Sequence, residues 1–318
     1  MIPRGGGIRL SLFESIPIGG GRTVRFYCED ALAHLTSRLG RSRADVIVTS
    51  PPYNLGVAYS TYHDDRPREE YLRWTGELRE AVLGTLGPRG SFFLNVGGPP
   101  SDPWLPWDVA RVVAEGLVLQ NVIHWVKSIA IDRSAAGKTA GLPDNLALGH
   151  YKPLKSGRYV HSAQEYVFHF SRDGNVPIDR LAIGVPYADK SNVTRWRGAR
   201  SGLRCRGNTW FLPYPTIRYR ARDRPHPATF PPELPEWCVR LHGVARTRRM
   251  VDPFVGIGSS AIAAVRLGVP FVGFDIDEEY LRVAAARVHQ EMAARRGRRD
   301  ASSVRRSPTA ARAARSRP

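Results

Sequence analysis

Cysteine is scarce in this chain of 318 residues. Its three cysteines, Cys28, Cys205 and Cys238, are odd in number and far apart, which argues against a disulfide framework or a zinc site, and no metal site is expected. Apolar runs are also short: no eighteen consecutive apolar residues occur, so no membrane-spanning helix is expected. Residues 1–7 lack the apolar core of a signal peptide, which predicts a cytoplasmic protein.

Acidic residues are few relative to basic ones. Lysine and arginine number 47 against 29 for aspartate and glutamate, which gives a net charge of +18 and a pI near 10.5. An excess of this size suggests a polyanionic partner, most often nucleic acid. Part of it lies in residues 292–318, which hold nine arginines, one acid and almost nothing to bury. We expect this segment to be a disordered basic tail, for which solubility is as good an explanation as nucleic-acid binding.

What the chain has is the composition of a globular protein, with 42% hydrophobic and 24% charged residues. After a Gly-rich stretch over residues 1–21, expected to be flexible, short β-branched or aromatic runs alternate with helical patterns. This alternation predicts an α/β fold with a mostly parallel sheet. Helices are expected over 68–86 and 277–291. The expected strands are 24–28, 45–49, 91–95, 120–126, 165–170, 249–252 and 271–275.

Two long segments interrupt the alternating pattern. Residues 128–162 are polar and rich in Gly, Pro, Lys and Arg, and residues 186–235 are rich in Pro and Arg. Loops of this length are usually functional or disordered. Between 186 and 224, many arginines alternate with Trp and Tyr, a mixture suited to phosphates and bases. We favour nucleic-acid contact over a solvated basic loop whose aromatics seal it onto the core.

A glycine turn follows one of the expected strands. The segment Met250–Ala261 reads as a strand ending at Asp252, a turn containing Gly256 and Gly258, and a helix start. Glycines at a helix N-terminus let the backbone approach a ligand closely. The next strand ends at Asp275, where a carboxylate can accept hydrogen bonds from ribose hydroxyls. A tight strand-to-helix turn explains the glycines equally well when they are taken alone.

A second motif follows the strand 45–49. The sequence Ser50-Pro51-Pro52-Tyr53 comes directly after it, and its two prolines fix the backbone and remove two N–H donors. What remains is a rigid turn that presents carbonyl oxygens, a hydroxyl and an aromatic ring. Such a turn suits a flat group bearing an NH₂, such as the edge of adenine or cytosine. Taken alone, the motif is better explained as a rigid loop with a packed tyrosine.

Together the two motifs resemble those of the DNA amino-methyltransferases, which methylate exocyclic amines with S-adenosylmethionine. The resemblance spans about residues 22–291, and the order of the motifs is similar to the circularly permuted beta class. It implies that Ser50, Pro51, Pro52 and Tyr53 are catalytic. It also implies a set of cofactor-binding residues, which comprises Asp30, Phe230, Asp252, Phe254, Gly256, Gly258, Ser260 and Asp275.

The resemblance also implies a fold. In the family, a Rossmann-like, mostly parallel sheet of seven strands has helices on both faces and the strand order 3-2-1-4-5-7-6. Mapped here, the strands 45–49 and 249–252 lie side by side at the topological switch point, where open α/β sheets bind ligands. Gly256 and Tyr53 are therefore expected to be spatial neighbours within a catalytic domain over 22–291.

The implied activity is methyl transfer to the exocyclic amine of a base flipped out of double-stranded DNA. A serine before Pro-Pro-Tyr favours cytosine N4 over adenine N6. The resemblance leaves open a homodimer and a companion restriction endonuclease. DNA-recognition insertions are expected at 128–162 and 186–224. The residues expected to hold the DNA are Lys127, Arg195, Arg197, Arg200, Arg204 and Arg206.

Three alternatives remain at this point. A NAD-dependent oxidoreductase would explain the glycine turn but leaves Ser50-Pro51-Pro52-Tyr53 unexplained. A noncatalytic nucleic-acid-binding module would explain the charge alone. An RNA or protein amine would also fit a pocket built for a flat NH₂-bearing group.

Overall fold

The computed structural model describes residues 12–40, 43–57, 59, 61–134, 144–149, 154–187, 202–213 and 229–306. Its helices are α1 (Ala31–Leu39), α2 (Arg68–Thr85), α3 (Leu105–Ala114), α5 (Glu233–His242), α6 (Ser259–Leu267) and α7 (Glu278–Arg306), with a short 3₁₀ turn, η4 (Val244–Arg246). None of the helices in these ranges is long and apolar enough to span a bilayer. The strands are β1 (Leu12–Gly19), β2 (Arg22–Cys28), β3 (Ala44–Thr49), β4 (Leu86–Val96), β5 (Val118–Val126), β6 (Ser128–Ile131), β7 (Leu146–Gly149), β8 (Gln164–Ser171), β9 (Val185–Pro186), β10 (Leu203–Arg204), β11 (Thr209–Phe211), β12 (Met250–Asp252) and β13 (Phe271–Asp275).

Within the described residues, the main sheet contains nine strands in the order β1-β2-β13-β12-β3-β4-β8-β5-β11. All seven expected strands are present, and their order from β2 to β5 is the expected one. Five of them, from β2 to β4, pair in parallel, whereas β8 is antiparallel to both its neighbours. The α/β fold class is thus confirmed. The expected count of seven strands is wrong, because β1 and β11 extend the two edges of the sheet.

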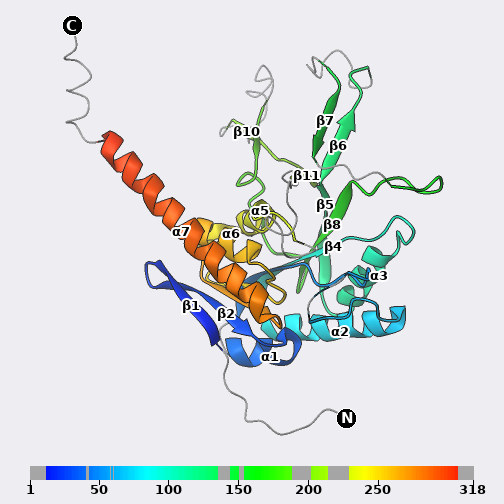
Figure 1. Cartoon of the computed structure of the whole chain (residues 1–318), viewed down its shortest axis with the longest axis horizontal. Coiled ribbons are helices and arrows are strands. Elements are labelled where there is room, and N and C mark those ends of the chain that lie inside the picture. The colour runs from blue at the N-terminus through cyan, green and yellow to red at the C-terminus, as the bar shows by residue number, and fades with distance from the viewer. Residues whose placement is uncertain are drawn as a thin grey trace.

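Helices cover both faces of this sheet (Figure 1). Because side chains alternate along a strand, Val46 and Val48 of β3 pack with α5, α6 and α7, whereas Ile47 packs with α1, α2 and α3. Strand β12 is buried along its length, and β3 is buried at every residue except Asp45, as expected for central strands of a parallel sheet. The motifs at the carboxyl ends of these two strands therefore meet at one edge of the sheet.

The expectation of a flexible N-terminus over 1–21 is wrong for residues 12–19. These residues form β1, which pairs with β2 in an antiparallel hairpin. Ile16 is buried in the core, and Gly20 and Gly21 make the turn with positive φ angles of 61° and 70°. The glycines led us to expect a flexible segment, but in the structure they form the turn of a hairpin.

The expected disordered tail over 292–318 is also wrong in part. Helix α7 continues from the core to Arg306, and residues 307–318 lie outside the described part of the chain. The physical reason is composition: Ala and Arg are strong helix formers, and no proline occurs until Pro308. The lack of apolar residues predicted disorder, but the high helix propensity of this segment explains why α7 continues through it.

The two long segments carry short strands. Within 128–162, β6 and β7 form an antiparallel hairpin that projects from the sheet (Figure 1). At the start of 186–224, β9 pairs with β10, which lies within the segment, and β11 extends the main sheet beside β5. Trp210 of β11 is buried, and its indole N–H donates to the carbonyl of Gly207, so this aromatic packs locally.

Candidate active site

A buried aspartate joins the two motifs. Strands β12 and β3 pair in parallel, and Thr49 Oγ1 donates a hydrogen bond of 2.6 Å to Asp252 Oδ1. Ser260 Oγ, at the start of α6, donates to Asp252 Oδ2 at 2.5 Å. Burial raises the pKa of Asp252 to about 6, although these hydrogen bonds favour its ionised form. Asp252 and Ser260 thus hold the two motifs together from behind the site rather than lining it.

The glycine turn between β12 and α6 has two different requirements. Gly256 donates its backbone N–H to Asp275 Oδ2 at 2.9 Å, which ties the turn to the end of β13. Gly258 caps α6 with φ 82°, and a Cβ there would lie 2.8 Å from the Cβ of Ala284 on α7. Gly256 therefore faces the ligand side, and Gly258 allows α6 and α7 to approach each other.

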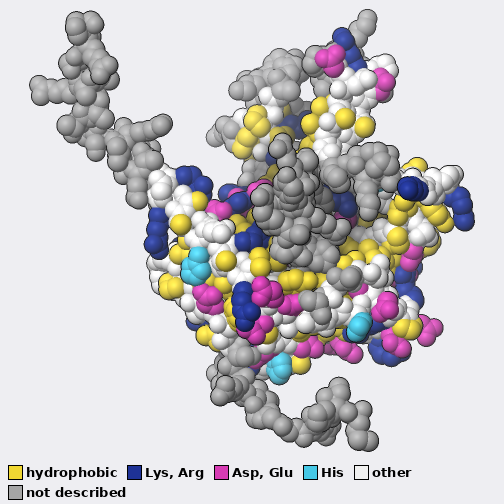
Figure 2. All heavy atoms as spheres, viewed as in Figure 1, with side chains coloured by type: hydrophobic (Ala, Val, Ile, Leu, Met, Phe, Trp, Pro, Cys, Tyr) yellow, Lys and Arg dark blue, Asp and Glu magenta, His cyan; other side chains and the backbone are white. Residues whose placement is uncertain are grey.

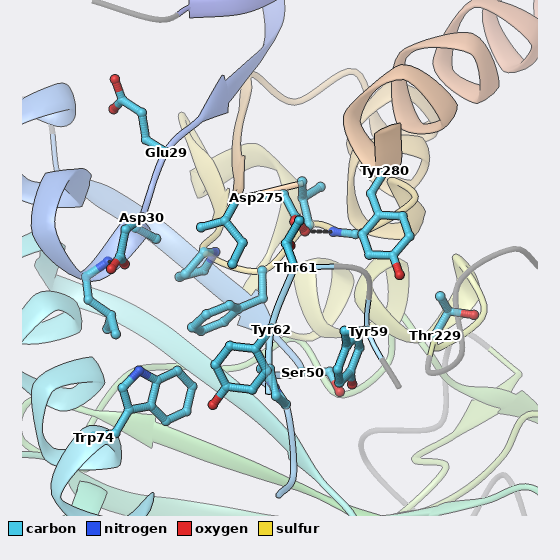
Figure 3. A pocket seen from close by; sticks show the side chains of 18 of the residues that line it. Glu29, Asp30, Ser50, Tyr59, Thr61, Tyr62, Trp74, Thr229, Asp275 and Tyr280 are labelled. Atoms are coloured by element: carbon cyan, nitrogen blue, oxygen red, sulfur yellow. Dashed lines mark hydrogen bonds between the residues drawn. The ribbon is translucent and has the colours of Figure 1, made fainter. Parts of the chain in front are cut away.

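A cavity of about 280 Å³ opens where the two motifs meet. Ser50 and Pro52 line it from the turn after β3, and Gly256 and Asp275 line it from the ends of β12 and β13 (Figure 3). Seven of the predicted residues line this one cavity: Asp30, Ser50, Pro52, Phe230, Phe254, Gly256 and Asp275. The Ser50 turn and the glycine turn thus meet at one cavity, although Tyr53, the residue expected beside Gly256, does not line it. Pro51, Tyr53, Asp252, Gly258 and Ser260 lie outside the lining.

Asp275 lines the cavity together with two other acidic residues, Glu29 and Asp30. Its Oδ2 accepts from Gly256 N and its Oδ1 accepts from Asp277 N at 3.0 Å. Burial raises the pKa of Asp275 to about 6, and the nearby charges of Asp277 and Asp252 act in the same direction. A carboxylate has about four lone-pair sites, so two backbone donors leave acceptor capacity for hydroxyl groups of a ligand.

An aromatic wall that the sequence did not predict completes the cavity. Tyr62 and Trp74 line one part of it with ring centroids 6.3 Å apart, and Tyr280 comes from α7 (Figure 3). Arg66 lies over both Tyr62 and Trp74, with its Cζ 5.2 and 5.7 Å from their centroids. Such faces suit a flat heterocycle. Trp74 is one of the buried residues of α2.

A chain of polar side chains lies beside the Ser50 turn. The hydroxyls of Ser50 and Tyr53 are 2.6 Å apart, and Tyr53 donates to Glu165 Oε2 at 3.1 Å. Asn95 Nδ2 donates to that same carboxylate oxygen at 2.6 Å and also to the Tyr53 hydroxyl. Lys127 Nζ donates to Glu165 Oε1 at 2.8 Å. The sequence drew attention to neither Asn95 nor Glu165, which lie on β4 and β8.

The residues predicted to hold DNA have varied surroundings. Lys127 pairs with Glu165 and is mostly buried, and Arg206 donates to the Ile183 carbonyl and stacks 4.0 Å from the Trp237 centroid. Arg204 on β10 is exposed. The remaining three, Arg195, Arg197 and Arg200, lie outside the described residues. No cluster of three or more potential metal ligands occurs in the described ranges.

Comparison with known proteins gives consistent results. A family model described as DNA methylase matches residues 44–286. The chain is 28% identical over 253 residues to the type II methyltransferase M.BglII of Bacillus subtilis, covering 76% of this chain and 62% of that protein. It is 26% identical over 270 residues to the type II methyltransferase M.HpaI of Haemophilus parainfluenzae, covering 84% and 74%. The chain thus spans less than two thirds of the first relative's length.

Solved structures share the fold. The PvuII DNA methyltransferase (cytosine-N4-specific) superimposes with a TM-score of 0.56 at 18% identity, covering 85% of this chain and 91% of that one. A Thermus thermophilus protein complexed with S-adenosyl-L-methionine gives a TM-score of 0.51 at 20% identity, covering 85% and 94%. At these identities the similarity concerns the fold alone.

Proposed function

Because the chain belongs to the DNA methylase family of S-adenosylmethionine-dependent DNA amino-methyltransferases, we propose that it methylates an exocyclic amine of a base in double-stranded DNA. The single observation that carries this proposal is the shared cavity: Ser50 and Pro52 line it together with Gly256 and Asp275. An oxidoreductase or a noncatalytic binding module would leave the Ser50 turn without a role there.

The cavity fits the cofactor S-adenosylmethionine. Asp275 retains acceptor capacity for the ribose hydroxyls, and Asp30, Phe230 and Phe254 line the same space. Gly256 lets the backbone approach closely, since it has no side chain. When bound, the cofactor supplies a methyl group on a sulfonium centre. The structure of the Thermus thermophilus protein complexed with the same molecule is consistent with this assignment.

The Ser50 turn is built to accept hydrogen bonds from an amine. Pro51 and Pro52 offer no N–H, and the Tyr71 hydroxyl donates to the Pro52 carbonyl at 2.9 Å, which fixes the turn. Ser50 Oγ and the Pro51 carbonyl accept the two hydrogens of the amine and aim the nitrogen lone pair at the methyl group. The rate gain comes from positioning and preorganised dipoles. After attack the methylated amine is cationic and gives its extra proton to water, since a serine is not a general base at neutral pH.

The target base is cytosine, methylated at N4, with adenine N6 as the alternative. Ser50 in the first position of the catalytic motif supports cytosine. The name of the PvuII enzyme, cytosine-N4-specific, agrees with this choice. A base inside a duplex cannot reach the cavity, so it must be flipped out. Tyr53 is proposed to stack on it.

DNA is held by the segments 128–162 and 186–224 and by the exposed Arg204, whereas Lys127 is paired with Glu165 and Arg206 stacks on Trp237. The projecting β6–β7 hairpin and the net charge of +18 support this role. Figure 2 shows basic side chains along α7, whereas acidic side chains gather over the helices at the bottom of the view. A homodimer and a companion restriction endonuclease stay predictions.

The test is to methylate unmodified DNA with the purified protein, digest it and identify the modified nucleoside by mass spectrometry. N4-methylcytosine is the expected product, and N6-methyladenine would select the alternative. 5-Methylcytosine would contradict the mechanism, because that chemistry needs a nucleophilic cysteine, and none of Cys28, Cys205 and Cys238 lines the cavity. Transfer to RNA or protein but not to DNA would overturn the proposed substrate class.

A further inference from the structure

A partly buried ion pair lies at the end of the polar chain that begins at the proposed catalytic serine. Lys127 Nζ and Glu165 Oε1 are 2.8 Å apart, with side-chain exposures of 21% and 14%. Burial disfavours the charge of Glu165, but the Lys127 ammonium and the hydrogen bonds from Lys127, Asn95 and Tyr53 outweigh it and hold the pKa of Glu165 below its ordinary value. Glu165 is therefore an ionised, acceptor-only group at neutral pH.

The hydrogen-bond capacity of Tyr53 then fixes a direction along this chain. A phenolic hydroxyl has one hydrogen to donate and two lone pairs. Its hydrogen goes to Glu165 Oε2, since a carboxylate can only accept. One lone pair accepts from Asn95 Nδ2, whose amide orientation is set because it also donates to Glu165. The remaining lone pair faces Ser50 Oγ, 2.6 Å away, so the serine must donate its hydrogen to Tyr53.

This hydrogen-bond direction determines what the Ser50 hydroxyl presents to the cavity. Among the described residues, Tyr53 is the partner of the Ser50 hydroxyl, and Ser50 lines the cavity. A serine hydroxyl that donates its only hydrogen to Tyr53 presents lone pairs alone to whatever enters. If Tyr53 instead donated to Ser50, the Ser50 O–H would face the amine. Two hydrogen-bond donors would then face each other, which is unfavourable.

We propose that the Lys127–Glu165 pair, acting through Tyr53, orients the Ser50 hydroxyl so that it accepts from the target amine. This inference rests on the proposed function and assigns Glu165 and Asn95 as positioning residues for it. It also supplies selectivity: an acceptor at Ser50 favours a base with an amine over one with a carbonyl at the same ring position, because two acceptors would face each other. The ion pair thereby gives a serine the acceptor character that a carboxylate has intrinsically.

The test is a double-mutant cycle between Glu165→Gln and Tyr53→Phe. Single-turnover methyl transfer from tritiated S-adenosylmethionine is measured at saturating DNA, and S-adenosylhomocysteine affinity reports on the fold and on the cofactor site. The amide of the introduced glutamine can donate a hydrogen bond to Tyr53. The hydroxyl of Tyr53 could then donate to Ser50, so the direction of the hydrogen bonds would no longer be fixed. We expect Glu165→Gln to slow transfer by about 10- to 100-fold, the usual cost of losing a group that orients a catalytic one. Cofactor affinity should stay within about twofold of the wild type.

The double-mutant cycle distinguishes an effect of Glu165 on the orientation of Ser50 from an effect on the stability of the protein. In the Tyr53→Phe background no hydroxyl connects Glu165 to Ser50, so Glu165→Gln should slow transfer no further. Glu236→Gln is the matched control: its side chain is 16% exposed and pairs with Arg240 on α5, and its loss should leave the rate unchanged. If Glu165→Gln fails to fold, Tyr53→Phe alone tests the chain, because it keeps the ring and must still slow transfer.

The outcomes distinguish this inference from the proposed function. A wild-type protein that transfers no methyl group to DNA overturns both. An active wild type with an unaffected Glu165→Gln variant overturns the inference alone. The same holds if Glu165→Gln slows transfer equally with and without the Tyr53 hydroxyl, since Glu165 would then act through another contact.

Discussion

Two carboxyl groups at the site, the buried Asp252 and the partly buried Asp275, share a raised pKa but have different contacts. Asp252 is 1% exposed, and both its oxygens accept from hydroxyl groups, those of Thr49 and Ser260. Asp275 lines the cavity and accepts from the backbone N–H of Gly256 and of Asp277. Only Asp275 is therefore available to a ligand, whereas Asp252 joins β12 to β3 and α6. A raised pKa does not by itself indicate which carboxylate binds.

The position of Asp275 leads to a pH-dependent affinity. Its pKa of about 6 means that the ionised form, which accepts best from ribose hydroxyls, is lost as the pH falls through 6. We expect the affinity for S-adenosylhomocysteine to fall about tenfold between pH 7 and pH 5, as measured by calorimetric titration. Asp275→Asn should bind weakly at pH 7 and lose this dependence. An unchanged pH profile in that variant would assign the titration to another group.

The site residues that could be predicted from the sequence are those marked by residue types that constrain the backbone or by the end of a strand. Proline and glycine identify the turns at Ser50 and Gly256, and the strand ends place Asp275. Tyr62 and Glu165 gave no such signal. Glu165 reaches Tyr53 only because β8 lies beside β4 in the sheet, and that neighbour relation is a tertiary fact.

At the scale of elements, the glycine turn also controls how helices pack. Gly258 begins α6 with φ 82°, a left-handed conformation that favours glycine, and α7 crosses so closely that a Cβ would lie 2.8 Å from the Cβ of Ala284 and 3.0 Å from its Cα. The contact is with the backbone of α7, which cannot move aside without displacing the helix. Helix α7 also carries Tyr280, which lines the cavity.

Gly258→Ala should therefore both destabilise the fold and weaken cofactor binding. We expect the free energy of unfolding to fall by about 1–3 kcal/mol in urea titrations, from the steric overlap and the strained φ. S-adenosylhomocysteine affinity should fall as well, because α7 and Tyr280 shift. Gly157→Ala is the control, since a Cβ there meets nothing within 4 Å. Equal stability of the two variants would contradict the packing argument.

A second connection between elements passes through two buried histidines. Ser91 Oγ on β4 lies 2.9 Å from His169 Nε2 on β8 and 2.9 Å from His242 Nδ1 on α5. Burial lowers the pKa of His169 to about 3 and that of His242 to about 4, so both are neutral in the folded protein. Unfolded histidines titrate near 6.5.

The unfolded chain therefore binds more protons than the folded one below pH 6.5, and stability is lost as the pH falls from there toward 4. Each histidine should lower the free energy of unfolding by about 1 kcal/mol between pH 6.5 and 5.5. Asp252 and Asp275 act oppositely, since their raised pKa values make the folded state bind protons between about 6 and 4. Urea titrations of His242→Gln against the wild type isolate the histidine contribution. If the free energy of unfolding depends on pH in the same way in the variant and the wild type, the proposed histidine contribution is wrong.

The elements themselves were largely predictable, because hydrophobic periodicity reports directly on burial. The strand expected over 271–275 is β13 without change, and helix α2 ends one residue earlier than expected. The errors came from composition. Glycines suggested looseness where β1 forms a hairpin, and lack of apolar residues suggested disorder where α7 continues to Arg306.

At the scale of the whole molecule, the charge is informative only together with its position. The net charge of +18 indicates a polyanion but not where it lies. The cavity opens at the carboxyl ends of the parallel strands, and the β6–β7 hairpin projects from the sheet (Figure 1). Within the insertion that contains this hairpin, residues 154–160 are exposed and include Lys155 and Arg158. A duplex that delivers a base to the cavity is expected to contact this insertion rather than α2.

Lys155→Gln combined with Arg158→Gln should therefore weaken DNA binding across all sequences. Each neutralised phosphate contact contributes about one unit to the slope of log affinity against log salt, so this slope should become shallower by about two. The guanidinium of Arg158 lies over the Tyr159 ring, 5.2 Å from its centroid, which leaves it at the surface for a phosphate. Fluorescence anisotropy over a salt series measures the slope, and single-turnover transfer at saturating DNA should stay unchanged. Arg73→Gln, which removes an exposed charge on α2, is the control. An equal change of slope in both variants would mean that the charge acts diffusely, and that the insertion is not where the duplex is held.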